Sequence, residues 1–263
     1  MSSVRPLFVV AGVGNGTGTG ASAARLFAQK GYKVALISRG PESLNKLAKE
    51  LSQQGGEAAG FAVQDYSPNS IRSAFAAIRS HYPPSSSPLR VALFNAGHGV
   101  WKPFLEITDE EVHNSLDINV AAAFAFSREV ITEFLKLGFE EPSEGGQGGA
   151  RKRGTLLFTG ATASIRGNVA TSAFAAGKHG LRGLSQSLAK EFGKQNIHVP
   201  QSIIDGVILT DRTKTRVNNP DWETNLDGRL DSNSIAKTYL DLVQQDSSAW
   251  TWEIDLRPAH EKW

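Results

Sequence analysis

The chain alternates short apolar runs with longer segments in which apolar residues recur every three or four positions. Runs of the first kind are typical of buried strands, and segments of the second kind are typical of amphipathic helices. The short runs are apolar along their whole length, which indicates a sheet that is covered on both faces. They predict strands at Leu7–Gly12, Lys33–Ser38, Ala58–Asp65, Leu89–Gly97, Gly154–Ser164, Asn196–Asp205 and Ala249–Leu256.

The longer segments predict helices at 21–31, 41–56, 67–82, 108–139, 172–192 and 234–245. Thr108 and Glu111 have the spacing of a capping box, which supports a helix start there. Alternating strands and helices imply parallel strands joined by crossovers. We therefore predict an α/β fold, a single Rossmann domain over residues 1–263 with a doubly wound, seven-stranded parallel sheet. Residues 209–230 are polar and irregular, and we expect them to form a variable substrate loop.

The composition excludes several classes of function. With 28 basic and 26 acidic residues the formal net charge is +2, so a nucleic-acid partner is not indicated. The chain has no cysteine, and its six histidines lack the spacing of metal ligands. It has neither a signal-peptide pattern nor an apolar run of about 20 residues that could span a membrane. We expect a cytoplasmic protein that acts on a small molecule, without a metal or a membrane partner.

One low-complexity stretch interrupts the alternation. Residues 140–154 are rich in glycine and contain the basic run 151–153. Because this stretch leads into a strand, it should lie at the edge of the sheet opposite the carboxyl ends of the strands, where ligands bind in such folds. We expect a solvated loop without a part in the chemistry.

A glycine-rich segment, AGVGNGTGTG, directly follows the first predicted strand and opens the first helix. Glycines there permit a tight turn and let backbone N–H groups approach a pyrophosphate at the helix N-terminus. A simple turn is the alternative, but the strand before and the helix after favour dinucleotide binding. The candidate phosphate-binding residues are Gly12, Gly14, Asn15, Gly16, Thr17 and Gly18.

The end of the second strand should decide which cofactor is bound. It carries Ser38 and Arg39, with no acidic residue before Glu42. An acid there would bind a ribose hydroxyl, whereas an arginine offers a charged fork to a 2′-phosphate. We therefore predict NADP(H) rather than NAD(H); the alternative is a solvated arginine in a turn.

Six motifs occur in the order found in one enzyme family, and the chain resembles the short-chain dehydrogenase/reductase family over essentially its whole length. They are the glycine pattern, Asp65, the NAG segment, Asn119 in DINVAA, Lys178, and DGVILT at 205–210. The resemblance implies that Asp65 contacts the adenine. It also implies cofactor-binding roles for Asn95, Gly97, Lys178, Val207, Ile208 and Thr210.

In this family, the resemblance implies, a tyrosine transfers the substrate proton with the help of a lysine, a serine and an asparagine. Asn119 and Lys178 are present, but the tyrosine position holds Phe174. The position that the family's serine would occupy is Ala161 in this chain. Thr162 and Ser164 are therefore the remaining candidates for polar contact with substrate. The alternative is that they cap the end of the strand. The chain's four tyrosines are not expected to reach the nicotinamide: Tyr32, Tyr66, Tyr82 and Tyr239.

Loss of the tyrosine points to a different electrophile. A positioned acid contributes about 10²–10⁴-fold to a reaction such as ketone reduction, and Phe174 cannot donate a proton. An iminium carbon needs no acid, and an aromatic face can stabilise its charge. Asp205 replaces the family's proline and could add a negative charge near the nicotinamide. We therefore predict an NADPH-dependent reductase of imines or iminium ions.

The expected pocket is apolar and aromatic, which suits a bulky substrate. Its candidate residues are His98, Val100, Trp101, Phe104 and Trp222. One alternative function is carbonyl reduction with His98, Thr162 or Asp205 as a substitute acid. Another is a catalytically silent protein that keeps the cofactor as a structural ligand.

The vacated tyrosine also resembles a branch of the family found in fungal indole-alkaloid pathways, in which some members guide a cyclisation after reduction. Arg128 supports this resemblance as a cofactor-site or active-site residue; a surface or subunit contact is its alternative. The loop of that branch is absent, since 163–168 reads ASIRGN. Family members pair through two long helices, so we expect a homodimer or homotetramer through 109–138 and 172–192.

Overall fold

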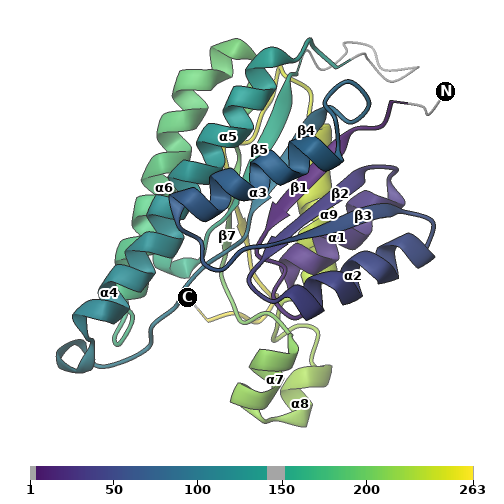
Figure 1. Cartoon of the computed structure of the whole chain (residues 1–263). Coiled ribbons are helices and arrows are strands. Elements are labelled where there is room, and N and C mark those ends of the chain that lie inside the picture. Colours follow the sequence, from purple (N-terminus) through teal and green to yellow (C-terminus); the bar gives the residue numbers. More distant parts are fainter. Residues whose placement is uncertain (1–3, 141–151, 263) are drawn as a thin grey trace.

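A central parallel sheet lies between two layers of helices in the computed structural model, which describes residues 4–140 and 152–262 (Figure 1). The sheet order is β3-β2-β1-β4-β5-β7-β8, with β6 paired to β5, and every pair is parallel. The predicted doubly wound α/β fold is therefore confirmed. The strands are β1 (Leu7–Ala11), β2 (Lys33–Ser38), β3 (Glu57–Ala62), β4 (Leu89–Phe94), β5 (Gly154–Thr159), β6 (Ile197–His198), β7 (Gln201–Ile204) and β8 (Glu253–Leu256).

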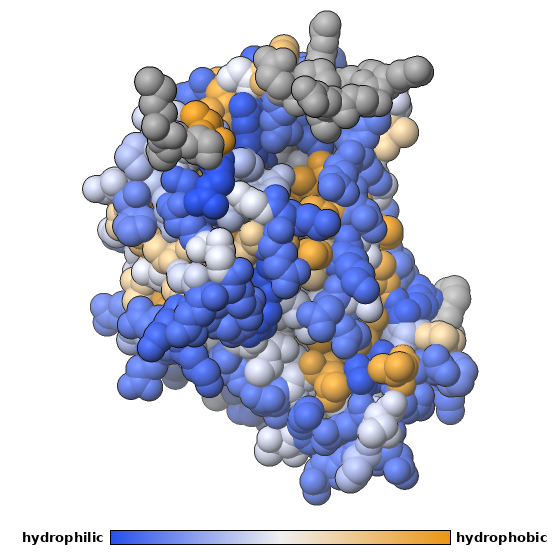
Figure 2. Space-filling view, turned by 90° about the vertical axis from the view of Figure 1, so that its right-hand side faces the viewer, coloured by the Kyte–Doolittle hydropathy of each residue, from blue (hydrophilic) through white to orange (hydrophobic). Residues whose placement is uncertain are grey.

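The central strands β1, β2, β4 and β5 are largely apolar because each of them contributes to two cores. Val9 and Ala11 face the core that contains α3, α5 and α6, whereas Phe8 and Val10 face the core that contains α1, α2 and α9. The surface seen from the right of Figure 1 is largely hydrophilic, with hydrophobic residues in separate patches (Figure 2). The α-helices are α1 (Thr19–Gln29), α2 (Pro41–Gln53), α3 (Pro68–His81), α4 (Asp109–Leu116), α5 (Ala122–Lys136), α6 (Ser172–Phe192), α7 (Asp211–Val217), α8 (Pro220–Thr224) and α9 (Ser232–Gln244).

Two predicted elements are divided. The single strand predicted at Asn196–Asp205 forms β6 and β7, because Pro200 lies between them and has no N–H for a ladder hydrogen bond. The sheet therefore has eight strands in the described residues rather than seven. The helix predicted at 108–139 contains a π-helical turn, Asp117–Ala121, between α4 and α5. Such turns are often found at functional sites, and this one carries Asn119.

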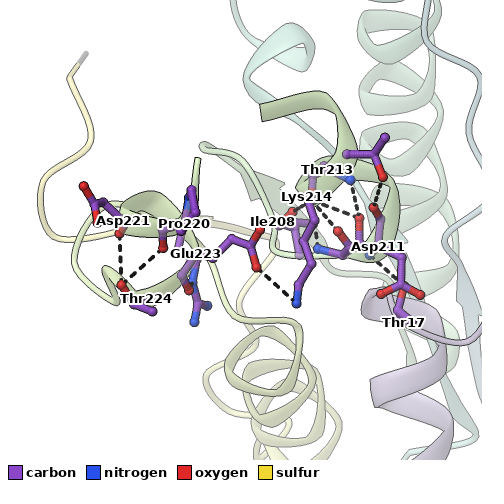
Figure 3. Close-up of polar contacts among 12 residues, drawn as sticks. Thr17, Ile208, Asp211, Thr213, Lys214, Pro220, Asp221, Glu223 and Thr224 are labelled. Atoms are coloured by element: carbon purple, nitrogen blue, oxygen red, sulfur yellow. Dashed lines mark hydrogen bonds and ion pairs between the residues drawn. The ribbon is translucent and has the colours of Figure 1, made fainter. Parts of the chain in front are cut away.

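The expectation of an irregular loop at 209–230 is wrong, because α7 and α8 lie within it. Thr210 caps α7 by accepting a hydrogen bond from the N–H of Thr213 (3.2 Å). Asn219 caps α8 in the same way. Lys214 and Glu223 join the two helices by an ion pair of 3.2 Å (Figure 3). The helices are too short to give a periodic apolar signal, and their caps are the sequence feature that could have revealed them.

The basic run at 151–153 is not simply a solvated loop end. Lys152 is buried, and its ammonium donates to the carbonyl of Val243 at the end of α9. A cation that satisfies a carbonyl of the last helical turn stabilises that end. The rest of the low-complexity stretch, 141–151, lies outside the described residues. No helix in residues 4–140 or 152–262 is long and apolar enough to cross a membrane.

Candidate active site

The glycine-rich loop between β1 and α1 requires its glycines for two reasons. Gly12, Gly14 and Gly16 have positive φ values of 96°, 56° and 94°, which side-chain-bearing residues rarely adopt. A Cβ on Gly12 would lie 2.4 Å from the backbone nitrogen of Ala96. Gly20, which was not among the predicted residues, also has no room for a side chain, since a Cβ there would lie 2.3 Å from the carbonyl oxygen of Gly12. Its place in the first turn of α1, two residues after Gly18, is the sequence feature that could have indicated this close contact.

The same loop is fastened to α7. The Oδ1 of Asn15 accepts a hydrogen bond from the Oγ1 of Thr17 (2.8 Å), and its Nδ2 donates to Asp211 (3.2 Å). The N–H of Asp211 donates to Thr17 (3.3 Å), and these two residues lie together in Figure 3. Gly18 is the N-cap of α1, and a Cβ there would lie 3.7 Å from a methyl carbon of Thr210. Segments almost 200 residues apart thus form one edge of the candidate cofactor site.

Arg25 of α1 holds the glycine-rich loop by a hydrogen bond, and it was not among the predicted residues. Its NH1 donates to the carbonyl of Gly16 (2.8 Å), while Nε and NH2 donate to both carboxylate oxygens of Glu50 on α2 (2.6 and 2.9 Å). The hydrogen bond to Arg25 lowers the pKa of Glu50. This bidentate pair holds a turn whose N–H groups must face an anion.

Arg39 lies at the carboxyl end of β2, as the sequence predicted. It is exposed, with its guanidinium carbon 5.6 Å from the centre of the Tyr66 ring, and Ser38 beside it is buried. Within residues 4–140 and 152–262, Arg39 makes no ion pair and no hydrogen bond. The glycine-rich loop, with an arginine beside it that has no ionic partner in the described residues, fits a dinucleotide that carries an additional phosphate.

Asp65 follows β3 and is exposed. Its Oδ1 accepts hydrogen bonds from the N–H of Ser67 (2.9 Å) and the hydroxyl of Ser70 (2.6 Å). Hydrogen bonding by the Ser67 side chain, then by the Ser70 hydroxyl and the Ser67 N–H, lowers the pKa of Asp65 to about 2. The carboxylate therefore stabilises the start of α3, and its contact with an adenine stays a prediction.

Asn95 joins the carboxyl ends of three strands. Its Nδ2 donates to the carbonyl of Gly12 after β1 (2.6 Å), and its Oδ1 accepts from the hydroxyl of Thr159 in β5 (2.9 Å). The same hydroxyl is bonded to the Tyr239 hydroxyl (2.8 Å). Tyr239 is fully buried beneath the site, which the sequence did not reveal, and its hydroxyl is engaged there.

Lys178 and Phe174 lie one turn apart on α6. The Lys178 ammonium donates to the backbone carbonyl of Thr159 (3.0 Å) and lies 5.9 Å from the centre of the Phe174 ring. A Cβ on Gly97 would lie 3.4 Å from this ammonium. Burial lowers the pKa of Lys178 to about 8. Two of its three N–H donors remain available to a ribose, a water or a substrate.

Asn119 in the π-helical turn holds the segment after β4. Its Nδ2 donates to the carbonyls of His98 (2.8 Å) and Ser115 (2.9 Å), and its Oδ1 accepts from the N–H of His98 (3.4 Å). A Cβ on Gly177 of α6 would lie 2.9 Å from the same Nδ2. Asn119 and Lys178 are therefore brought to one place, on either side of Gly97.

Ser164 does not contact a substrate from its observed position. It is completely buried, and its hydroxyl oxygen accepts a hydrogen bond from the N–H of Ala161 (3.1 Å), so the capping alternative is correct. Thr162 is half-buried, and its hydroxyl donates to Asp205. Its proton is thus engaged by the Asp205 carboxylate.

The expectation that Asp205 adds a negative charge near the nicotinamide also needs correction. Asp205 is buried, and its carboxylate lies 3.4 Å from Arg166 and 3.5 Å from Arg257. Two guanidinium groups therefore balance its charge. The arginines come from 39 residues before and 52 residues after it, so local sequence could not reveal this cluster.

Of the predicted pocket residues, Trp101 and Phe174 are in contact, with ring centres 5.3 Å apart. Val100 is buried, whereas Phe104 is 74 % exposed. Trp222 lies in α8 and makes no ring contact with Trp101 or Phe174 in the described part of the chain. The aromatic surface is therefore smaller than predicted.

His98 lies beside this surface, and its pKa is lowered. The main cause is burial, and the positive charges of Arg39 and Arg212 add to it, against a weaker opposite effect of Glu111. Neutral imidazole is therefore favoured at pH 7, which weakens His98 as a substitute acid.

The segment that leaves β7 is held by pairing with Leu230. The N–H of Leu230 donates to the carbonyl of Val207 (3.0 Å), and Ile208 forms a parallel bridge with Leu230. Val207, Ile208 and Thr210 therefore lie between the end of the sheet and α7. Their contact with a cofactor stays a prediction.

The assignment of Arg128 to the cofactor site is wrong. Arg128 is exposed on α5 and lines a surface groove of about 530 Å³ together with Leu116, Val120 and Phe124. The groove contains none of the residues that surround the glycine-rich loop or Lys178. Its alternative, a surface or subunit contact, fits the structure.

Comparisons with known proteins agree with this arrangement. The sequence profile of the family described as short chain dehydrogenase matches residues 8–221. The chain is 28% identical over 245 residues to a 3-oxoacyl-[acyl-carrier-protein] reductase of Chlamydia trachomatis, which covers 92% of each chain. It is 31% identical to a short-chain dehydrogenase structure from Rhodopseudomonas palustris, with a TM-score of 0.74 over 95% of this chain and 98% of that one. An alcohol dehydrogenase from Thermococcus sibiricus, complexed with 5-hydroxy-NADP, is 21% identical and has a TM-score of 0.80 over 98% of each chain.

Replacing Lys178 with methionine should raise the melting temperature of the cofactor-free protein at pH 7, by roughly a few degrees. A lowered lysine pKa means that burial penalises the charged form, and methionine removes that penalty. The penalty is complete below pH 8 and fades as the pH rises toward the ordinary lysine value. The gain should therefore shrink at pH 9.5. Thermal denaturation measures it, with Lys190→Met on the exposed face of α6 as control; an equal loss of stability at both pH values would contradict the prediction.

Replacing Glu50 with glutamine should weaken NADPH binding by roughly 3- to 10-fold, because Arg25 would lose its ionic partner and hold the Gly16 carbonyl less firmly. Fluorescence titration with NADPH measures the effect. Glu42→Gln, an exposed change at the start of the same helix, is the matched control. Unchanged affinity in Glu50→Gln would show that the clamp does not support the loop.

Proposed function

This chain belongs to the short-chain dehydrogenase family, and from that premise we propose that it is an NADPH-dependent reductase of carbon–nitrogen double bonds in bulky apolar substrates. The observation that carries the proposal is the pair of Phe174 and Lys178 on α6. The family resemblance puts a proton-donating tyrosine at position 174, and phenylalanine cannot supply a proton. The lysine and the cofactor loop are nevertheless retained, so the site keeps the means to transfer hydride.

NADPH fits the site better than NADH. The glycine-rich loop leaves room for a pyrophosphate, and Arg39 at the end of β2 has no ionic partner in the described residues. A guanidinium in this place suits the 2′-phosphate that distinguishes the two cofactors. The Thermococcus alcohol dehydrogenase, a structural neighbour, binds an NADP derivative, which agrees with this choice.

NADPH, when bound, supplies the hydride. The Lys178 ammonium can donate two hydrogen bonds to the ribose while its third N–H remains hydrogen-bonded to the Thr159 carbonyl. Phe174 and Trp101 present an apolar surface that excludes water and accommodates a cationic carbon. An iminium carbon accepts the hydride, its π electron pair moves to nitrogen, and a neutral amine results. The step requires no proton from residue 174.

Carbonyl reduction is a second candidate, because relatives of this chain are named as 3-oxoacyl reductases. It would need an acid close to Phe174. Lys178 is the group that fits, since its ammonium lies 5.9 Å from the ring centre and its pKa is lowered to about 8. The neutral His98 and the charge-balanced Asp205 are weaker substitutes. A guided cyclisation gains no support, because Arg128 lies in the outer groove.

We further propose that the chain forms a dimer through α4 and α5. Phe124 is 51 % exposed and Leu116 is 38 % exposed in the groove that they share with Arg128. Apolar side chains gathered on one surface favour an interface. In α6, Ala173, Ala175 and Gly177 are buried within the chain, whereas Ala176 and Gly183 are exposed and remain available to a partner.

The Phe174→Tyr variant should gain ketone turnover by about 10- to 100-fold, because it restores an acid next to Lys178. Its imine turnover should stay the same or fall. NADPH consumption with a panel of cyclic imines and ketones measures both, and Phe139→Tyr, an exposed change after α5 that lies outside the candidate site, is the control. Faster turnover of ketones than of imines by the unaltered protein would contradict the proposed function.

The Arg39→Gln variant should bind NADPH about 10- to 100-fold more weakly, with NADH affinity nearly unchanged, because only NADPH carries the phosphate that this charge would meet. Parallel titrations of both cofactors measure the ratio. If the unaltered protein binds NADH as tightly as NADPH, the cofactor assignment is wrong.

A further inference from the structure

The short helix α7 presents different residues to different neighbours. Lys214 points to Glu223 on α8, and Asp211 lies against Thr17 of the glycine-rich loop (Figure 3). Both contacts fix the rotation of the helix about its axis. Arg212 and Arg216, one turn apart, therefore share a third side of α7.

That third side faces the segment after β4, because the guanidinium carbon of Arg216 lies 5.6 Å from the centre of the Trp101 ring. The positive charge of Arg212 on the same side contributes to the lowered pKa of His98, which agrees with this orientation. Arg216 is thus directed toward the aromatic surface of the candidate active site.

Neither arginine has an anionic partner within the described part of the chain. In the residues that the structure describes, Arg212 and Arg216 make no ion pair and no hydrogen bond. The nearby acids are already engaged: Asp211 accepts from Asn15, and Glu223 pairs with Lys214. Glu111, whose charge also acts on His98, pairs with Lys102. The mouth of the site is therefore positive, and NADPH phosphates at the glycine-rich loop and Arg39 do not account for Arg216.

Arg216 is connected to the reacting end of the site by a row of contacts. Its guanidinium lies over Trp101, the Trp101 ring lies 5.3 Å from Phe174, and Phe174 lies 5.9 Å from the Lys178 ammonium. A substrate that covers the aromatic surface of Trp101 and Phe174 has Lys178 at one end and Arg216 at the other. The cation–π contact holds the guanidinium beside the indole, and its N–H groups remain able to donate to an anion.

We propose that Arg216 binds a carboxylate of the substrate, so that the preferred substrate is a bulky imine that carries an acidic group. The proposal rests on the proposed function for the imine and on Arg216 alone for the carboxylate. The carboxylate is the natural partner of a planar guanidinium, which binds it through two parallel hydrogen bonds. It would also offset the repulsion between a cationic iminium and the arginines at the mouth of the site.

The test compares 3,4-dihydroisoquinoline with its 3-carboxylate. The unaltered protein should prefer the carboxylate in kcat/KM. Arg216→Gln should lower kcat/KM for the carboxylate by about 10- to 100-fold, mainly through KM, and change that for the neutral imine less than about 2-fold. Arg216→Lys should restore part of the loss. Lys190→Gln removes a positive charge from the exposed side of α6, and it should leave both substrates unaffected.

Equal losses for both imines in Arg216→Gln would overturn the proposal, because Arg216 would then act only by positioning Trp101. The absence of any preference for the carboxylate in the unaltered protein would overturn it as well. Calorimetric titration of the NADP⁺-loaded protein with the reduced amine product of each imine compares their binding affinities without turnover. If only ketones are reduced, but a carboxylated ketone is preferred through Arg216, the proposed function fails and the carboxylate site stands.

Discussion

The close approach of the backbone at the carboxyl ends of β1 and β4 is the constraint on which the site depends. Gly12 and Gly20 have no room for a Cβ, and Asn95 bonds the Gly12 carbonyl to Thr159 in β5. The strand ends are thereby held in one arrangement. From it follow the turn that can receive a pyrophosphate and the position of the Thr159 carbonyl, which is the hydrogen-bond partner of Lys178.

The consequence for chemistry is a buried ammonium that is bonded to a neutral carbonyl. Removing a cation from water is costly, so the protein maintains Lys178 at the expense of its own stability. Such a group is retained for function rather than for folding. With Phe174 beside it in place of a hydroxyl, the ammonium has lost the partner that the family resemblance implies, while the means to hold a cofactor remain.

The helix α7 completes the site from the opposite side. Contacts of Asp211 attach it to the glycine-rich loop, and Arg216 reaches Trp101 after β4. The same short element therefore contacts both the candidate cofactor loop and the aromatic surface where we propose that the substrate binds. Because α7 is exposed and short, its order depends on these contacts rather than on its own helix propensity.

The sequence alone determined the fold, since apolar runs without alternation indicate a sheet covered on both faces. The glycines after the first strand also indicated a turn that can bind a pyrophosphate. The sequence also determined that position 174 cannot donate a proton. Only the tertiary structure decided that Asp205 is balanced by Arg166 and Arg257, that Ser164 is a buried cap, and that Arg128 lies in an outer groove. Periodicity reports which face of an element is buried. Charge balance and site membership depend on which distant residues meet, and that is set when the elements pack together.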